Sequence, residues 1–154
     1  MKLLELLDPS VIKIGMSASD KGESFVELIS LLDRAGRVPD NEAALDALWA
    51  REELRSTGIG NGVAIPHGKD TSIQHITAAA GTSDKGIPFN SIDGKPVHLI
   101  FLVLARVNDP GPHLQTLSEI ATCLNVSGAY DQLVQAATPE EFLEVIKAGE
   151  EAGI

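Results

Sequence analysis

The sequence predicts an α/β fold, a sandwich in which a mixed, mostly parallel β-sheet carries helices on both faces. Segments of strand character alternate with segments of helical periodicity along the chain. Residues 97–104 are apolar at nearly every position, which is typical of a strand buried on both sides. The chain has 154 residues, of which 44% are hydrophobic, so we expect residues 1–154 to form a single domain.

The helices are predicted from apolar side chains that recur at i, i+3, i+4 and i+7. The first is expected over residues 21–35, and Gly36 follows it as a stop signal. Further helices are expected at about residues 41–54, 114–124, 130–136 and 139–147. His113 then lies in the first turn of a helix, and Thr138 and Glu141 have the spacing of a capping box.

The strands are predicted from short apolar runs bounded by turn residues. Besides residues 97–104, they are expected at residues 11–14, 63–65 and 76–82. Turns are expected at residues 83–86 and 93–94, a break at 108–112, and a glycine-rich loop at 58–62, because these segments concentrate Gly, Pro, Asn, Asp and Ser.

Charge and cysteine content narrow the functional classes. The chain carries 12 basic and 22 acidic residues, a net charge of −10, which disfavours nucleic acid as a partner. Cys123 is the single cysteine, and in a predicted helix it is interpreted as a small packed side chain. The start lacks the features of a signal peptide, and the longest later apolar run, 99–105, is far shorter than the roughly 20 residues of a membrane helix. We expect a cytoplasmic protein without direct membrane insertion.

His67 is the leading candidate for chemistry. Three glycines precede it within the segment 58–62, Pro66 fixes the backbone before it, and Gly68 removes side-chain bulk after it. This pattern favours an accessible imidazole beside backbone N–H groups that can receive a phosphate. A neutral ring nitrogen is a good nucleophile near pH 7 and can take a phosphoryl group. The alternative is a tight turn that only leads into a strand.

A phosphoryl group on His67 would need a cation and a second hydrogen-bonding group, but no metal. Arg51 and His113 are the leading candidates. Their structural alternatives are a solvated charge at a helix end and a polar residue of a first helical turn. Lys69 is either a point charge for the phosphate or an ordinary surface lysine.

The remaining histidines receive no role. His75 falls in a predicted loop, and His98 begins a buried strand, where a hydrogen-bonded structural histidine is common. His67, Asp70 and His75 form a loose cluster, but its spacing matches no tight ligand pattern. We therefore expect no metal. Residues 58–62 also lack the G-x-G-x-x-G spacing of a dinucleotide-binding loop, and we expect no organic cofactor.

Arg51-Glu52 and the segment from Ser56 to Lys69 closely resemble the active-site motif of enzyme IIA proteins of the fructose/mannitol class, from the phosphoenolpyruvate-dependent phosphotransferase system. The resemblance continues through residues 86–89, 93–97 and 113–117. It implies that His67 is phosphorylated, through Nε2, that Arg51 steadies the phosphoryl charge, and that His113 hydrogen-bonds the phosphate or its neighbour. The motif also covers secondary residues of the phosphate loop: Thr57, Gly60, Asn61, Gly62, Gly68 and Lys69.

The resemblance further implies the partners of such a phosphocarrier. The donor would be HPr or a nitrogen-branch equivalent, and the acceptor a downstream regulated protein or a IIB component. Gly68-Lys69 and residues 113–117 look most like the nitrogen-regulatory branch. Three alternatives stay open: a sugar-specific component that feeds a separate IIB domain, an interaction module that is not phosphorylated, and a metal-dependent hydrolase, which would require stoichiometric metal.

Overall fold

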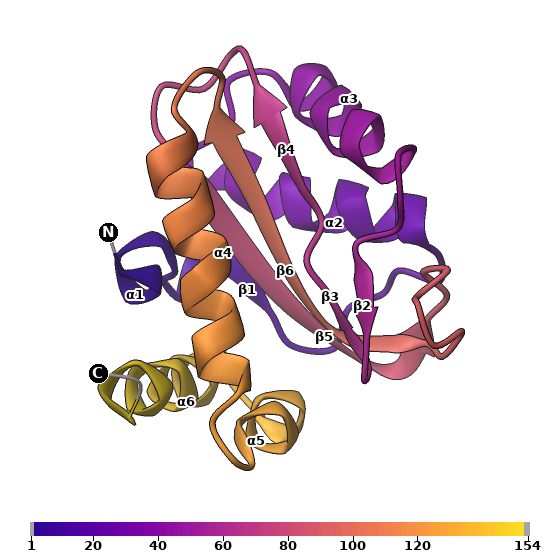
Figure 1. The fold of residues 1–154 in the computed structure, drawn as a ribbon, viewed down its shortest axis with the longest axis vertical. Coiled ribbons are helices and arrows are strands. Elements are labelled where there is room, and N and C mark those ends of the chain that lie inside the picture. Colours follow the sequence, from indigo (N-terminus) through magenta and orange to yellow (C-terminus); the bar gives the residue numbers. More distant parts are fainter. Residues whose placement is uncertain (1, 153–154) are drawn as a thin grey trace.

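A computed structural model describes residues 2–152, which form a six-stranded mixed sheet with helices on both faces (Figure 1). The strands are β1 (Ile12–Lys13), β2 (Gly58–Gly60), β3 (Val63–Ala64), β4 (His67–Asp70), β5 (Thr77–Ile87) and β6 (Val97–Arg106). Their order is β1-β5-β6-β3-β2, and β4 also pairs with β6. The pairings β1·β5, β3·β6 and β4·β6 are parallel, whereas β2·β3 and the long β5·β6 pair are antiparallel.

The helices form the two outer layers. They are α1 (Leu3–Leu6), the 3₁₀ turn η1 (Pro9–Val11), α2 (Lys21–Arg34), α3 (Asn41–Glu52), α4 (Pro110–Leu124), α5 (Ala129–Gln135) and α6 (Pro139–Ala152). α2 packs against β5 and α3 against β4, whereas α4 and α5 pack against β6. In Figure 1, α4 crosses in front of the strands and α2 lies behind them. The predicted fold class is confirmed.

Local chemistry explains where the helices begin. The Asp20 carboxylate accepts a hydrogen bond from the Glu23 N–H (2.8 Å), and Asp40 accepts from the N–H groups of Glu42 and Ala43 (3.0 and 3.1 Å). Such caps satisfy N–H groups that have no partner inside the helix. No helix within residues 2–152 is both long enough and apolar enough to span a bilayer.

β3 and β4 are two pieces of one strand that runs along β6. Val63 is in register with Leu99 and His67 with Val103, and between them the Pro66 carbonyl accepts a hydrogen bond from the Val103 N–H (2.9 Å). Proline has no N–H to donate, so the ladder is interrupted at Pro66 and resumes at His67. His67 thus lies on a short strand, a position that the expected strand at residues 63–65 did not include.

Two segments that were expected to be loops belong to the sheet. The glycine-rich segment forms β2 and a hairpin turn, in which Asn61 and Gly62 both have positive φ (56° and 81°), as a two-residue hairpin turn requires. The turn expected at residues 83–86 was wrong, because β5 continues to Ile87. A shift in register between Thr82 and Ile87, with Gly86 at φ +84°, accommodates the turn-forming residues within the strand.

Gly68 lets α3 lie directly against β4. A Cβ atom on Gly68 would lie 2.5 Å from the Ala47 carbonyl oxygen and 3.0 Å from the Leu48 nitrogen. Both are backbone atoms of α3, and they cannot move aside as a flexible side chain can. The absence of a side chain at Gly68 therefore fixes the distance between the helix that carries Arg51 and the strand that carries His67.

We predict that Gly68→Ala forces α3 away from β4 and lowers the free energy of unfolding by about 1–3 kcal/mol, the usual cost of overpacking. Urea unfolding measures this change. Gly111→Ala is the matched control, because no atom lies within 4 Å of a Cβ at that position in α4. It is expected to cause no loss of stability. Equal stability of the two variants would contradict the close contact.

Candidate functional site

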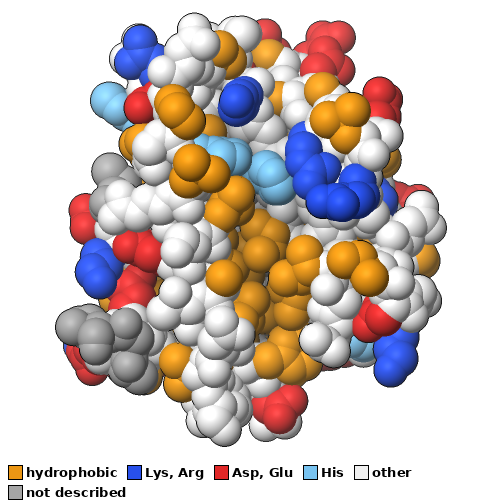
Figure 2. Space-filling view, viewed as in Figure 1, with side chains coloured by type: hydrophobic (Ala, Val, Ile, Leu, Met, Phe, Trp, Pro, Cys, Tyr) orange, Lys and Arg blue, Asp and Glu red, His pale blue; other side chains and the backbone are white. Residues whose placement is uncertain are grey.

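The structure brings His67 and His113 together. Their ring centroids lie 5.3 Å apart with an interplanar angle of 56°. α4, which carries His113, packs against β6, and β6 also carries Val103, the register partner of His67. Figure 2 shows the histidines side by side on this face, with Lys and Arg side chains close by and hydrophobic side chains around them. His67 is half-buried and His113 is 8% exposed.

A backbone contact fixes the tautomer of His67. Its Nδ1 lies 2.8 Å from the carbonyl oxygen of Ile65. A carbonyl oxygen can only accept a hydrogen bond, so Nδ1 must carry the proton. In the neutral ring the lone pair then belongs to Nε2, which is the nucleophilic atom.

The surroundings favour the neutral form of both histidines. Burial lowers the pKa of His67 below its ordinary value of 6.5; the Arg51 charge acts in the same direction, whereas the Ile65 carbonyl and the Glu52 charge oppose it. The pKa of His113 is also lowered, first by burial and then by the charges of His67 and Lys69. Near pH 7 a neutral, nucleophilic ring is therefore available at His67.

Arg51 lies in the last turn of α3 and lines two cavities together with His67. One of its Nη groups donates to the carbonyl oxygen of Arg55 (2.7 Å), which places the guanidinium over the segment that leads into β2. The two residues come from neighbouring elements, because α3 packs against β4.

Glu52 holds the site together inside the fold, a role that the sequence did not reveal. Its carboxylate is buried and accepts hydrogen bonds from Lys21 Nζ (2.8 Å), the Thr57 N–H (2.9 Å) and Thr57 Oγ1 (2.6 Å). Glu52 thereby holds the end of α3 to the start of β2. A carboxylate in the last turn of a helix is unfavourable with the helix dipole, and that was the available signal that it needs partners.

Only some of the predicted secondary residues of the phosphate loop line the two cavities next to His67. The cavity of about 520 Å³ is lined by Ala47, Ala50, Arg51, Leu54, His67, Gly68, Lys69, Pro110, His113 and Leu114. The cavity of about 310 Å³ is lined by Arg51, Arg55, Ser56, Thr57, Ile59, Ile65, His67, Ile92 and Leu117. Thr57, Gly68 and Lys69 thus lie beside His67.

Gly60, Asn61 and Gly62 lie instead at the β2–β3 hairpin turn and line neither cavity. The Asn61 N–H donates to the Asp93 carboxylate (2.9 Å), and the Gly62 carbonyl accepts from the His98 N–H (2.8 Å). These contacts account for the turn without a phosphate, so the predicted phosphate contacts of these three residues stay predictions.

Exposed apolar side chains gather around the histidines. In the described part of the chain, five large hydrophobic side chains are exposed, namely Val26, Leu54, Ile59, Ile92 and Leu114. All except Val26 line the two cavities. Single exposed apolar residues are ordinary, but a cluster marks a surface that contacts another molecule.

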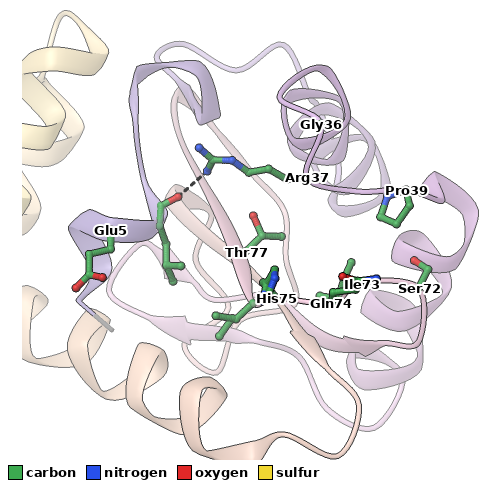
Figure 3. A pocket seen from close by; sticks show the side chains of 11 residues that line it. Glu5, Gly36, Arg37, Pro39, Ser72, Ile73, Gln74, His75 and Thr77 are labelled. Carbon is green, nitrogen blue, oxygen red and sulfur yellow. Dashed lines mark hydrogen bonds between the residues drawn. The ribbon is translucent and has the colours of Figure 1, made fainter.

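A larger cavity, of about 620 Å³, is lined by neither His67 nor His113 and lies between α1, the α2–α3 connection and the loop before β5 (Figure 3). His75 lies on its wall and is exposed. Arg37 also lines it, but its guanidinium already donates to the Leu6 carbonyl (2.7 Å) and pairs with Asp8. Size alone does not make this cavity the functional site, because it contains none of the residues of the motif.

The other residues singled out from the sequence, His98, Cys123 and Asp70, make contacts that stabilise the fold. His98 Nδ1 lies 2.8 Å from the Ser83 carbonyl oxygen and therefore donates to it, as expected for a structural histidine. Cys123 is buried, as predicted, and burial raises the pKa of its thiol to about 11. The Asp70 carboxylate accepts from the N–H and hydroxyl of Ser72 (2.8 and 2.7 Å).

The fold is that of the IIA components of the phosphotransferase system. The crystal structure of nitrogen regulatory protein IIA-Ntr from Neisseria meningitidis is similar over 94% of this chain and 98% of that one, with 34% identity and a TM-score of 0.86. Escherichia coli enzyme IIAMtl, solved in complex with phosphorylated enzyme IIBMtl, shares the fold with a TM-score of 0.79 and 22% identity, over 92% of this chain and 97% of that one.

Residues 5–149 match the family of phosphoenolpyruvate-dependent sugar phosphotransferase system EIIA 2 domains, and the chain belongs to this family. The fructose-specific EIIABC component of Bacillus subtilis is 36% identical over 146 residues, which are 95% of this chain and 23% of that protein. This chain therefore spans less than a quarter of that relative's length.

The lowered histidine pKa values predict a titration that NMR of the imidazole rings can follow. His67 is expected to take up its proton below pH 6.5, with Nδ1 protonated in the neutral form. Arg51→Gln should raise the pKa of His67, because it removes a nearby positive charge, whereas Arg55→Gln should leave this pKa unchanged. An unaltered His67 titration in Arg51→Gln would contradict the placement of Arg51.

The same pKa values predict how stability depends on pH. The unfolded chain binds protons at histidine near pH 6.5, whereas the folded site resists protonation until a lower pH. This contribution to stability is therefore complete above pH 6.5 and is lost as the pH falls through the lowered values. Urea unfolding at several pH values should show a smaller loss when His67 and His113 are both replaced by Gln.

Proposed function

We propose that this chain is a phosphocarrier that accepts a phosphoryl group on Nε2 of His67. The observation that carries the proposal is the hydrogen bond from His67 Nδ1 to the Ile65 carbonyl, since it leaves Nε2 with the lone pair. The ring lines two cavities with Arg51, and His113 lies beside it. Family membership supports the same reaction class.

The proposed step exchanges one phosphorus–nitrogen bond for another. The Nε2 lone pair of His67 attacks the phosphorus of a phosphohistidine on the donor protein, and the donor's bond breaks with its electron pair returning to the donor ring. The Nδ1 proton stays on His67, where the Ile65 carbonyl and the Glu52 charge favour the positive charge that develops on the ring. The step needs no proton acceptor.

Arg51 and His113 have the roles of charge stabilisation and hydrogen bonding in this proposal. Arg51 neutralises part of the phosphoryl charge from the end of α3. His113 lies against the His67 ring, and its buried Nδ1 has no hydrogen-bond partner among the described residues. A buried polar atom without a partner is costly, and a phosphate oxygen or a reoriented neighbour would supply one. Lys69 and Thr57 are proposed as secondary contacts.

The donor and the acceptor are proposed to be proteins. Four exposed apolar side chains around the histidines provide the kind of surface that contacts a protein and that a small metabolite does not need. An HPr-type carrier is the proposed donor, and the exchange takes place in the cytoplasm, where phosphoenolpyruvate drives such carriers. The acceptor is a IIB component or a regulated protein.

We favour the nitrogen-regulatory branch, in which the phosphorylation state of His67 controls a partner. The motif residues Gly68-Lys69 and 113–117 support it, as does the likeness to the Neisseria meningitidis protein. The sugar-specific branch is the second candidate, supported by the identity to the fructose-specific component. Rapid transfer from phosphorylated His67 to a fructose-type IIB domain would favour the sugar branch instead.

The central prediction is that the chain becomes labelled when it is incubated with labelled phosphoenolpyruvate, enzyme I and an HPr-type carrier. His67→Ala should abolish the label, because the accepting nitrogen is gone. Arg51→Gln should slow labelling by roughly a hundredfold, the usual effect of removing one charge-stabilising donor. Quench-flow labelling with ³¹P NMR of the product measures both the rate and the position of the phosphate.

His98→Gln is the control for this experiment, because His98 donates to Ser83 and lies outside the two cavities. It should be labelled at the wild-type rate. Label that persists in His67→Ala, or a wild-type chain that takes no label from any carrier, would overturn the proposal and favour a module that only binds.

A further prediction concerns the apolar surface. Leu54 and Ile92 are 82% and 79% exposed, so Leu54→Ser and Ile92→Ser should leave folding intact. They should raise the KM for the phosphorylated carrier about tenfold, an effect of the size expected for an interface residue. Val26→Ser is the matched control, since Val26 is 53% exposed on α2 and lines neither of the two cavities. An equal effect of Val26→Ser would contradict a localised docking surface.

A further inference from the structure

The cavity of about 620 Å³ has the size and the mixed walls of a small-molecule site. It is lined by residues of α1, of the α2–α3 connection and of the β4–β5 loop, together with Thr77, the first residue of β5 (Figure 3). Small-molecule sites in proteins have volumes of about 300–1,000 Å³ and walls that combine apolar side chains with a few polar groups. The apolar side chains here are Leu6, Pro39, Ile73 and Ile76.

The hydroxyl of Thr77 is a buried polar group on the wall of this cavity. Thr77 is only 4% exposed, and its Oγ1 has no hydrogen-bond partner among residues 2–152. In Figure 3 its side chain lies between those of Arg37 and His75. Thr82 on the same strand is the ordinary case, because its Oγ1 accepts a hydrogen bond from the Gly15 N–H (3.2 Å). Most buried hydroxyl groups are paired in this way, so the Thr77 hydroxyl is one that a bound molecule would satisfy.

Arg37 supplies further hydrogen-bond donors to the cavity. Its Nη groups donate to the Leu6 carbonyl (2.7 Å) and to the Asp8 carboxylate, and a guanidinium has more N–H groups than these bonds use. The charge of Arg37 is already opposed by Asp8, and Glu5 adds a carboxylate to the wall. The cavity therefore offers donors without a net positive charge, which suits an uncharged acceptor better than an anion.

We propose that this cavity binds a small uncharged molecule that combines a carbonyl or amide oxygen with a short apolar body. The oxygen accepts hydrogen bonds from the Thr77 hydroxyl and the Arg37 guanidinium. The apolar body lies against Leu6, Ile73 and Ile76, because these side chains cannot pair with polar groups. Binding is non-covalent and involves no group transfer.

The cavity adjoins the start of α3 and the end of β4. Pro39 precedes α3, whose last turn carries Arg51, and Ser72 follows β4, whose first residue is His67. Neither His67 nor His113 lines the cavity. A bound molecule therefore contacts the connection before α3 and the loop after β4, and it leaves the two cavities at the histidines open. This second site does not depend on the proposed phosphocarrier function.

Three small molecules of similar shape test the proposal: isobutyramide is uncharged, isobutyrate is an anion and isobutylammonium is a cation. In ¹⁵N-labelled protein, isobutyramide should shift the N–H resonances of Ile73 and Thr77 and saturate with a millimolar Kd, as expected for so small a ligand. Each charged molecule should bind about tenfold more weakly, because its charge finds no uncompensated partner. Shifts that do not saturate, shifts centred on His67 and His113, or tighter binding of a charged molecule would overturn the proposal.

Thr77→Val removes the hydroxyl and keeps the shape of the side chain. It should weaken isobutyramide binding about three- to tenfold, the effect of losing one hydrogen bond, without lowering the free energy of unfolding. Thr82→Val is the matched control on β5: it should lower this free energy, because the Gly15 N–H loses its acceptor, and should leave binding unchanged. Unchanged binding by Thr77→Val would overturn the proposal. So would an equal loss of stability in both variants, because the Thr77 hydroxyl would then already be paired. Phosphoryl transfer plays no part in these measurements, so their failure leaves the phosphocarrier proposal intact.

Discussion

The packing of α3 directly on β4 through Gly68 is the contact on which the rest of the site depends. With a hypothetical Cβ only 2.5 Å from the Ala47 carbonyl oxygen, the space between the helix and the strand leaves no room for a side chain at Gly68. This contact holds Arg51, four residues along α3 from Ala47, beside a strand whose first residue is His67. Glu52 then ties the same end of α3 to Thr57, so the helix that carries Arg51 is also joined to the start of β2.

The interruption at Pro66 has a chemical consequence. At this interruption the Ile65 carbonyl accepts the Nδ1 proton of His67 and is the group that selects the tautomer. The backbone therefore decides which ring nitrogen is nucleophilic, and burial beside Arg51 keeps that nitrogen unprotonated. The interruption of the strand at Pro66 and the nucleophilicity of His67 Nε2 therefore both depend on the backbone of residues 65 and 66.

The charged side chains that line the cavities at the histidines differ in sign from the net charge of the chain. The chain as a whole is acidic, while the surface around the histidines is apolar and basic. These cations act on the histidines themselves, since the charges of Arg51 and Lys69 help to lower the pKa values of His67 and His113. The buried Glu52, which Lys21 and Thr57 contact inside the fold, acts in the opposite direction on His67.

The sequence by itself determined the fold class, the helices from α2 onward, and the candidates His67, Arg51 and His113, because hydrophobic periodicity and short motifs are local properties. Only the tertiary structure decided that the two histidines lie 5.3 Å apart, since they come from different elements, 46 positions apart in the sequence. It also showed that the Asn61-Gly62 pair belongs to a hairpin, that Gly68 is required by α3, and that Glu52 is an anchor. These facts depend on which backbones and side chains meet across the sheet, and no local pattern encodes such contacts.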